Sequence, residues 1–202
     1  MPIRALAVAL PLTMITGCTN AMEATPPVPQ PAVASAVTGP PGTGAEGTFL
    51  PWRPGVRAVT YDPAVVPQGA TATLTITRTG YATTVRLAAT GLIPRRMYGA
   101  HLHTGACTAI PDEAGPHYQN HPDPVSPPSA NPVYANARNE IWLDFTATAA
   151  GTGRAVATHG WSFDPARPPR SLVLHADHTH TAPGEAGKAG ARVACLTLPT
   201  ES

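Results

Sequence analysis

The sequence predicts an all-β protein, an antiparallel sandwich or barrel of about eight strands with two long loops. Several short segments alternate apolar and polar residues with a period of two, as half-buried strands do. Glycine and proline separate these segments at close intervals, and no segment has a convincing helical period. The chain of 202 residues is long enough for one such domain and additional segments.

The clearest strand is residues 70–77, ATATLTIT, which places apolar side chains on one face and threonines on the other. Residues 82–89 repeat this pattern, and Gly80 and Tyr81 between the two segments suit a hairpin turn. The remaining strand candidates, in chain order, are residues 56–61, 97–103, 140–146, 154–163, 171–175 and 192–198.

Two segments interrupt the regular spacing of the strands. Residues 104–138 are rich in Pro, Asn and Asp and do not alternate, and residues 176–191 form a second, shorter loop. Loops of this length inside a compact domain are usually functional or disordered.

The N-terminus has the features of an export signal. Arg4 precedes an apolar run over residues 5–15, which is too short to span a bilayer but typical of a signal-peptide core. The sequence Ile15-Thr16-Gly17-Cys18 resembles the lipobox of bacterial lipoproteins, in which the signal is cut before the cysteine and the cysteine is lipidated. We therefore expect residues 1–17 to be a lipoprotein signal peptide and Cys18 to attach the exported protein to the cell envelope.

After Cys18 the composition is dominated by Pro, Ala, Gly, Thr and Val, with little bulky apolar content. Such a segment cannot bury a core, so residues 18–47 are expected to be an extended, disordered tether. The folded domain is expected to be residues 48–202.

Charge and cysteine content narrow the class of protein further. Only 12% of residues are charged and the net charge is +1, which excludes a basic nucleic-acid-binding surface.

If Cys18 carries lipid, Cys107 and Cys195 remain as an even pair in an oxidising compartment, where a disulfide between them is stable.

Four histidines form the candidate metal site. His101 and His103 are two residues apart in a predicted strand, so both side chains point to the same face. His117 lies in the long loop, and His175 ends the apolar strand at residues 171–175. Four imidazoles without a thiolate suit copper or zinc, and four nitrogens in a tetragonal arrangement favour Cu(II).

Five motifs in this order resemble those of the copper/zinc superoxide dismutase family. They are Gly-Ala-His101-Leu-His103, Cys107, Gly115-Pro116-His117, Leu172-Val173-Leu174-His175-Ala176, and Gly187 to Cys195 with Arg192 between them. The resemblance covers about residues 56–199 and implies an eight-stranded Greek-key barrel whose two long loops carry the metal site.

The resemblance also implies a role for each matched residue. His101, His103 and His175 match copper ligands, and His117 matches the histidine that bridges copper and zinc. Cys107 and Cys195 match the disulfide that ties the loop to the barrel. Arg192 matches the guanidinium that attracts the anionic substrate.

The implied activity is the conversion of superoxide to oxygen and hydrogen peroxide at copper. A permanent cation such as Arg192 would raise the local concentration of the superoxide anion. His117 would leave reduced copper, take up a proton and pass it to the forming peroxide. Arg192 and His117 are therefore the expected catalytic residues.

The zinc half of the family pattern is incomplete. The candidate ligands are His117, His121, Asp123 and Glu140, and Asn139-Glu140 stands where the family has its Gly-Asp pair. A tetrahedral zinc site usually needs four protein ligands, and these candidates would give at most a distorted set. The ligand set therefore favours a zinc-free loop over a distorted zinc site. Copper-only members of the family exist, and the chain resembles them in this respect.

Two other functions remain open from the sequence. The incomplete zinc loop favours a copper-binding or copper-sequestering protein without catalysis, and a metal-free β-domain is the third possibility. No role is assigned to the three remaining histidines, His159, His178 and His180.

Overall fold

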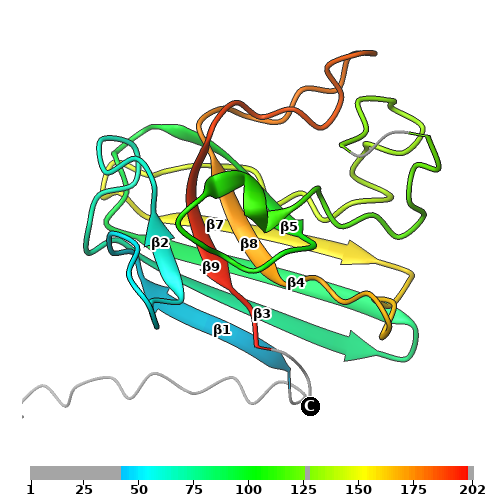
Figure 1. Ribbon diagram of the computed structural model, residues 1–202, viewed down its shortest axis with the longest axis horizontal. Helices are drawn as coiled ribbons and strands as arrows, with labels where there is room; N and C mark the ends of the chain where they lie inside the picture. Colours follow the sequence, from blue (N-terminus) through cyan, green and yellow to red (C-terminus); the bar gives the residue numbers. More distant parts are fainter. Residues whose placement is uncertain (1–41, 126–127, 200–202) are drawn as a thin grey trace, which may run out of the picture. The chain divides into compact units, whose positions relative to one another are not determined.

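The computed structural model describes residues 42–125 and 128–199. In this part of the chain, nine β-strands form two antiparallel sheets (Figure 1), so the expected all-β sandwich is confirmed. No helix among these residues is long and apolar enough to cross a membrane. The expected signal peptide at residues 1–17, Cys18 and the tether up to residue 41 lie outside the described residues.

The first sheet has four strands in the order β1-β3-β4-β7. These are β1 (Thr43–Thr48), β3 (Thr71–Thr79), β4 (Ala82–Thr90) and β7 (Gly153–His159). The alternation in β3 and β4 has the effect expected from the sequence, because their small and apolar side chains are buried while the threonines of β3 lie toward solvent.

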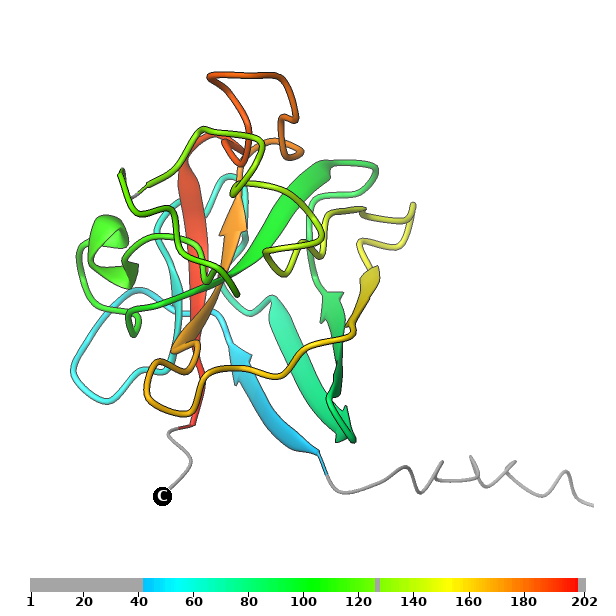
Figure 2. The same ribbon diagram turned by 90° about the vertical axis from the view of Figure 1, so that its right-hand side faces the viewer.

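The second sheet has five strands in the order β2-β9-β8-β5-β6. These are β2 (Ala58–Thr60), β9 (Arg192–Thr197), β8 (Ser171–His175), β5 (Met97–His103) and β6 (Phe145–Thr146). Figure 2 shows the two sheets facing each other. The core between them is formed by large apolar side chains of both sheets, among them Leu74, Leu87, Tyr98, Leu102, Leu172, Leu174 and Leu196.

Strand β1 corrects the expected boundary between tether and domain. Residues Thr43–Thr48 pair with β3 in antiparallel register, although the composition of this segment resembles that of the tether. Small residues suit the position, since a Cβ atom at Gly47 would lie only 2.6 Å from the Cβ of Ala58. The folded domain therefore begins before residue 48.

Three of the expected strands are shorter than the sequence predicts. Residues 56–61 contribute only β2, and residues 154–163 contribute β7, which ends at His159. Residues 140–146 contribute only β6, because Glu140 and Trp142 form single bridges to Gln119 and His101 instead of continuing one ladder. This irregular segment directs Glu140, Trp142 and Asp144 toward the histidines described below.

The long loop contains a short 3-10 helix, η1 (Pro111–Ala114), and is tied to the second sheet. A disulfide joins Cys107 in the loop to Cys195 in β9, which confirms the pairing expected from the sequence. The two loops also meet, since Gly184 N donates a hydrogen bond to Ala130 O at 3.2 Å. The described parts of the two loops therefore contact each other.

Candidate metal centre

Strand β5 places His101 and His103 on the outer face of the second sheet. Their neighbours Ala100 and Leu102 alternate with them and belong to the core between the sheets. Both imidazoles are nevertheless completely buried. The loops cover this face, which explains why every residue of β5 after Met97 is buried.

His175 reaches the same face from the end of β8. It is paired with Gly99 of β5, two residues before His101. A side chain at residue 99 would collide with Asp177 O, 2.6 Å from a Cβ atom, and with the Cβ of Ala189 at 2.7 Å. Glycine at this position therefore lets the loop that follows His175 pass close over the strand.

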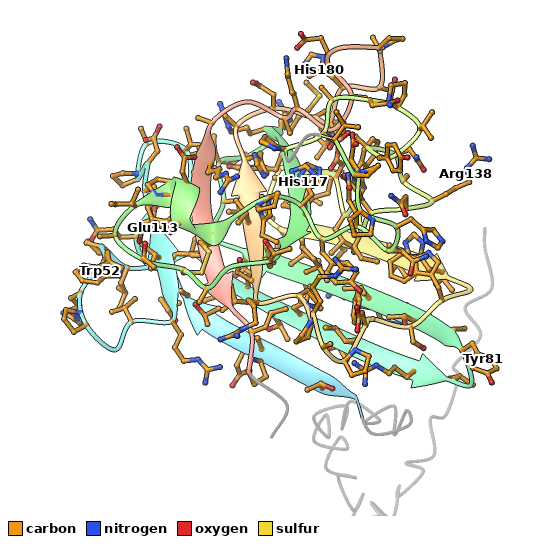
Figure 3. All side chains as sticks on the ribbon, turned by 45° about the vertical axis from the view of Figure 1, so that its right-hand side comes forward. Trp52, Tyr81, Glu113, His117, Arg138 and His180 are labelled. Atoms are coloured by element: carbon orange, nitrogen blue, oxygen red, sulfur yellow. A yellow bond between two sulfur atoms is a disulfide. The ribbon has the colours of Figure 1, made fainter. Side chains whose placement is uncertain are left out.

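His117 comes from the long loop and forms an antiparallel bridge with His103. Tyr118 N donates to Leu102 O at 2.8 Å, and Thr104 N donates to Pro116 O at 3.1 Å. These backbone bonds fix the loop beside the end of β5. Figure 3 shows His117 directed inward, whereas His180 and Arg138 extend from the surface.

The four histidines His101, His103, His117 and His175 form one compact cluster. Each offers one ring nitrogen, and these atoms all lie within 4.8 Å of one another. In the described ranges 42–125 and 128–199, no other group of three or more His, Cys, Asp or Glu side chains is close enough to hold a metal ion.

The outer nitrogen of each ring has a hydrogen-bond partner. His103 Nδ1 donates to Gly115 O at 2.8 Å, and His175 Nδ1 donates to Gly190 O at 3.3 Å. His117 Nδ1 donates to the Glu140 carboxylate at 2.8 Å, and His101 Nε2 lies 2.6 Å from Thr179 Oγ1. Such bonds fix the tautomer and orientation of metal-binding imidazoles.

The inner nitrogens of His103, His117 and His175 are therefore left with lone pairs directed into the cluster. His101 Nδ1 is buried and has no hydrogen-bond partner. His103 Nε2 and His175 Nε2 lie 3.3 Å apart, although both rings already donate through Nδ1. Two facing lone pairs and an unpartnered buried nitrogen are unfavourable alone and are satisfied by a shared cation. The donor set thus fits a metal ion of the copper or zinc type.

Burial keeps the imidazoles of His101, His103 and His175 neutral. It lowers the pKa of His101 and His103 well below the ordinary value of 6.5, and the neighbouring His117 lowers both further. Burial, followed by His117, lowers the pKa of His175 to about 3. Neutral imidazole is the form that binds metal, so no proton has to be displaced from these three rings at neutral pH.

Asp144 supports His101 from the segment before β6. Its carboxylate accepts hydrogen bonds from Thr179 N at 2.7 Å and from Ala100 N at 3.2 Å. The distance from Asp144 Oδ1 to His101 Nε2 is 3.5 Å. Asp144 and Thr179 together join the loop over residues 176–191 to a histidine on β5.

Glu140 performs the corresponding role for His117. Its oxygen Oε2 accepts from both His117 Nδ1 and Trp142 Nε1, at 2.8 and 2.7 Å, and Oε1 accepts from Gln119 Nε2 at 2.8 Å. The carboxylate is almost completely buried. Three donors compensate for its burial and hold His117 in one orientation.

Arg192 lies beside the cluster at the start of β9. Its Nη1 donates to Pro111 O and Asp112 O at 3.0 and 3.3 Å, and its Nη2 donates to Gly115 O at 2.8 Å. Burial lowers the pKa of Arg192, and Asp112 opposes this change. Arginine still keeps its charge at neutral pH, so a fixed cation accompanies the four histidines.

Two of the other zinc candidates, His121 and Asp123, are not part of the four-histidine cluster. His121 is exposed, and its backbone N–H donates to Asn139. Asp123 accepts hydrogen bonds from Ser129 Oγ and from Val125 N. Glu140 contacts His117 by a hydrogen bond. In the described residues, His121, Asp123 and Glu140 do not form a group of ligands close enough to share a metal ion.

The three histidines without an assigned role lie outside the cluster. His159 is buried against Trp161, with ring centroids 4.6 Å apart. His178 is exposed and approaches Phe145 O through Nε2 at 3.3 Å, and His180 is also exposed.

Sequence reasoning missed Asp144, Thr179 and Trp142 as neighbours of the metal-binding rings. A usable signal was present, because Glu140, Trp142 and Asp144 alternate with the buried residues Ile141 and Leu143. This alternation places the three polar side chains on one face. Only the fold shows that this face meets the histidines.

Comparison with known proteins shows which solved structures have a similar fold. No protein-family model matches the sequence, and no curated protein is significantly similar to it. Among solved structures, the Cu/Zn superoxide dismutase of Brucella abortus is similar with a TM-score of 0.50 and 18% identity, over 79% of this chain and 100% of that chain. A double mutant of a SOD-like protein from Bacillus subtilis has a TM-score of 0.46 and 16% identity, over 63% of this chain and 88% of that chain.

The chain therefore has a superoxide-dismutase-like fold, an all-β sandwich of two antiparallel sheets. In addition it has a four-histidine cluster suited to copper and a disulfide from the long loop to β9.

Proposed function

We propose that this protein is an extracytoplasmic superoxide dismutase that converts superoxide to oxygen and hydrogen peroxide. The observation that carries the proposal is the set of four inward-facing imidazole nitrogens within 4.8 Å of one another, accompanied by Arg192. His101 would bind copper through Nδ1, and His103, His117 and His175 would bind it through Nε2.

Copper bound there would supply one-electron chemistry by alternating between Cu(II) and Cu(I). Arg192 would attract and orient the superoxide anion, because its guanidinium is fixed by three carbonyl oxygens and keeps a positive charge next to the cluster. Its half-buried position reduces screening by water.

His117 would move the proton that peroxide formation requires. It is the most exposed of the four histidines, with 15% of its side chain accessible. Glu140 holds the Nδ1 proton, so Nε2 is the atom that would take up a proton and deliver it to the product. The partially exposed ring allows the proton to be replaced from solvent.

Copper alone is expected to suffice for this reaction. His117 Nδ1, the atom that would face a second metal, is bonded to Glu140 instead. Glu140 therefore supplies the orientation that a zinc ion would otherwise give, and we do not assign zinc to the site.

Export and lipid attachment at Cys18 remain part of the proposal. The disulfide between Cys107 and Cys195 supports an oxidising compartment. Mass spectrometry of the chain from a membrane fraction tests the anchor: a diacylglycerol-modified N-terminal cysteine is expected, and an unmodified secreted chain would contradict it.

The function is tested by superoxide decay with the copper-loaded full chain and its His175→Ala variant. We expect rapid decay that is lost together with tight copper binding in the variant. His180→Ala is the matched control, because this exposed histidine lies outside the cluster. Decay no faster than with a copper-free chain would refute the proposal.

A copper-binding protein without turnover is the second candidate. The contacts of Arg192 favour it, because Nη1 donates to Pro111 O and Asp112 O, which leaves fewer donors for a substrate. Stoichiometric copper binding without superoxide decay would identify this function.

A further inference from the structure

Trp142 lies beside the four-histidine cluster, and the proposed reaction does not use it. Its ring centroid is 6.0 Å from that of His101, and the two residues form an antiparallel backbone bridge. Trp142 Nε1 donates to Glu140 Oε2 at 2.7 Å, and the same oxygen accepts from His117 Nδ1 at 2.8 Å. The indole therefore adjoins one histidine directly and another through a single carboxylate oxygen.

This environment suits the loss of an electron from the indole ring. Indole is among the most easily oxidised side chains, and its N–H becomes strongly acidic once an electron has left. A buried carboxylate oxygen on Nε1 is ready to receive that proton. The short, charge-assisted hydrogen bond also fixes the ring at this position.

The proposed reaction creates a need for such a donor, because it releases hydrogen peroxide beside a copper ion that every cycle would return to Cu(I). Peroxide would take one electron from the Cu(I) held there and one proton from solvent, its O–O bond would break, and water and a hydroxyl radical would result. This radical would otherwise attack the nearest rings, which are the copper ligands themselves.

We propose that Trp142 is a sacrificial electron donor that protects the histidine ligands from peroxide-derived oxidants; the inference rests on the proposed copper function. Trp142 gives one electron to the hydroxyl radical, which becomes hydroxide and then takes a solvent proton to form water. The Nε1 proton passes to Glu140 Oε2. Trp142 is left as a neutral indolyl radical, and the half-buried ring gives that radical access to external reductants.

The other two tryptophans provide internal controls. Trp161 Nε1 donates to a backbone carbonyl, that of Arg138, at 3.0 Å, and its ring packs against His159. Trp52 is 44% exposed. Oxidant arriving from solvent would therefore attack Trp52 first, whereas oxidant formed at the cluster would reach Trp142 first.

The experiment uses the full chain with copper, reduced stoichiometrically with dithionite and then treated with hydrogen peroxide and a nitrone spin trap. Peptide mass spectrometry locates the trap, and copper release is followed over time. Trp142→Phe is the test variant and Trp161→Phe is the matched control. Bound copper is measured before peroxide is added.

We expect the nitrone adduct at Trp142 in the unaltered chain and in Trp161→Phe. In Trp142→Phe, oxidation should move to His101 and copper should be released severalfold faster. The adduct in the unaltered chain tests the proposal even without a folded variant. An adduct distributed by exposure, with Trp52 first, would overturn it, as would equal copper release from both variants.

Failure of the proposed dismutase function is distinguishable from failure of this inference. A chain that binds copper, forms the Trp142 adduct and does not accelerate superoxide decay refutes the dismutase and supports the electron donor. A chain that dismutates superoxide and forms no Trp142 adduct supports the dismutase and refutes the electron donor.

Discussion

His103 and Arg192 donate hydrogen bonds to the same carbonyl oxygen, that of Gly115, each at 2.8 Å. One backbone atom of the long loop therefore orients a metal-binding ring and positions the nearby cation. Gly115 has a positive φ of 72°, which permits the turn that presents this carbonyl. The position of the loop thus determines both the metal site and the charge beside it.

Arg192→Ala should lower the rate of superoxide decay about tenfold, because it removes the fixed charge that attracts the anion. The decrease of the rate with ionic strength should also become weaker. Stopped-flow or pulse-radiolysis rates at several salt concentrations measure both effects. Arg154→Ala, an exposed residue of β7, is the control, and an equal effect there would contradict a local role for Arg192.

Glu140→Gln should weaken copper binding about 10- to 100-fold, as loss of an outer partner of a metal-binding histidine typically does. A glutamine amide has one acceptor oxygen and cannot accept from His117, Trp142 and Gln119 together. Competitive chelator titration measures the affinity. Glu46→Gln, at an exposed position of β1, should leave it unchanged.

Acid should destabilise the metal-free protein through the buried histidines. The pKa of His175 is lowered to about 3, and burial also lowers that of His101 and His103. As pH falls below about 6.5, the unfolded chain binds protons on these residues while the folded chain does not, so the free energy of unfolding decreases.

Each group contributes up to about 1.4 kcal/mol per pH unit in this range. Thermal unfolding of the metal-free chain between pH 7 and pH 4 should show the decrease, and His180→Gln should retain it. A melting temperature independent of pH over this range would disprove the assigned burial of the rings.

Removing the disulfide with Cys107→Ala and Cys195→Ala should lower the free energy of unfolding by about 4 kcal/mol, because the cross-link spans 88 residues. Urea unfolding measures the change. The unaltered chain in reductant should behave like the double variant. A difference between these two samples would point to an effect of the alanines rather than of the lost cross-link.

Gly153→Ala should destabilise the sandwich by about 1–3 kcal/mol, because the added Cβ would overlap the ring of Phe145. Phe145 is buried and stacks on Tyr98 with centroids 5.3 Å apart, so it has little room to move. Gly160→Ala is the control, since a Cβ there meets no atom within 4 Å. Equal urea midpoints for the two variants would contradict this packing.

The patterns that depend on local sequence predicted much of this molecule. Alternation identified β3 and β4, and residues 97–103 were expected as the strand that is β5. The spacing of His101 and His103 placed both rings on one face. Strand β1 was missed because glycine, alanine and threonine give the same composition in an edge strand and in a tether. Its stability comes from pairing with β3, which composition does not reveal.

The contacts around the cluster depend on tertiary structure and were less predictable. Glu140 was expected as a zinc candidate, yet its carboxylate accepts from His117, Trp142 and Gln119. Thr179 is far from His101 in sequence, and only the return of the second loop brings Oγ1 to 2.6 Å from Nε2. The ring tautomers, and hence the inward nitrogens, follow from such contacts.

We propose that superoxide is dismutated at copper held by the four histidines without zinc. Pulse radiolysis of the full chain, titrated with copper in zinc-free buffer, measures this activity. We predict a decay rate that rises in proportion to bound copper and stops rising when the single site is filled. Full copper occupancy with decay no faster than for the metal-free chain would contradict the claim.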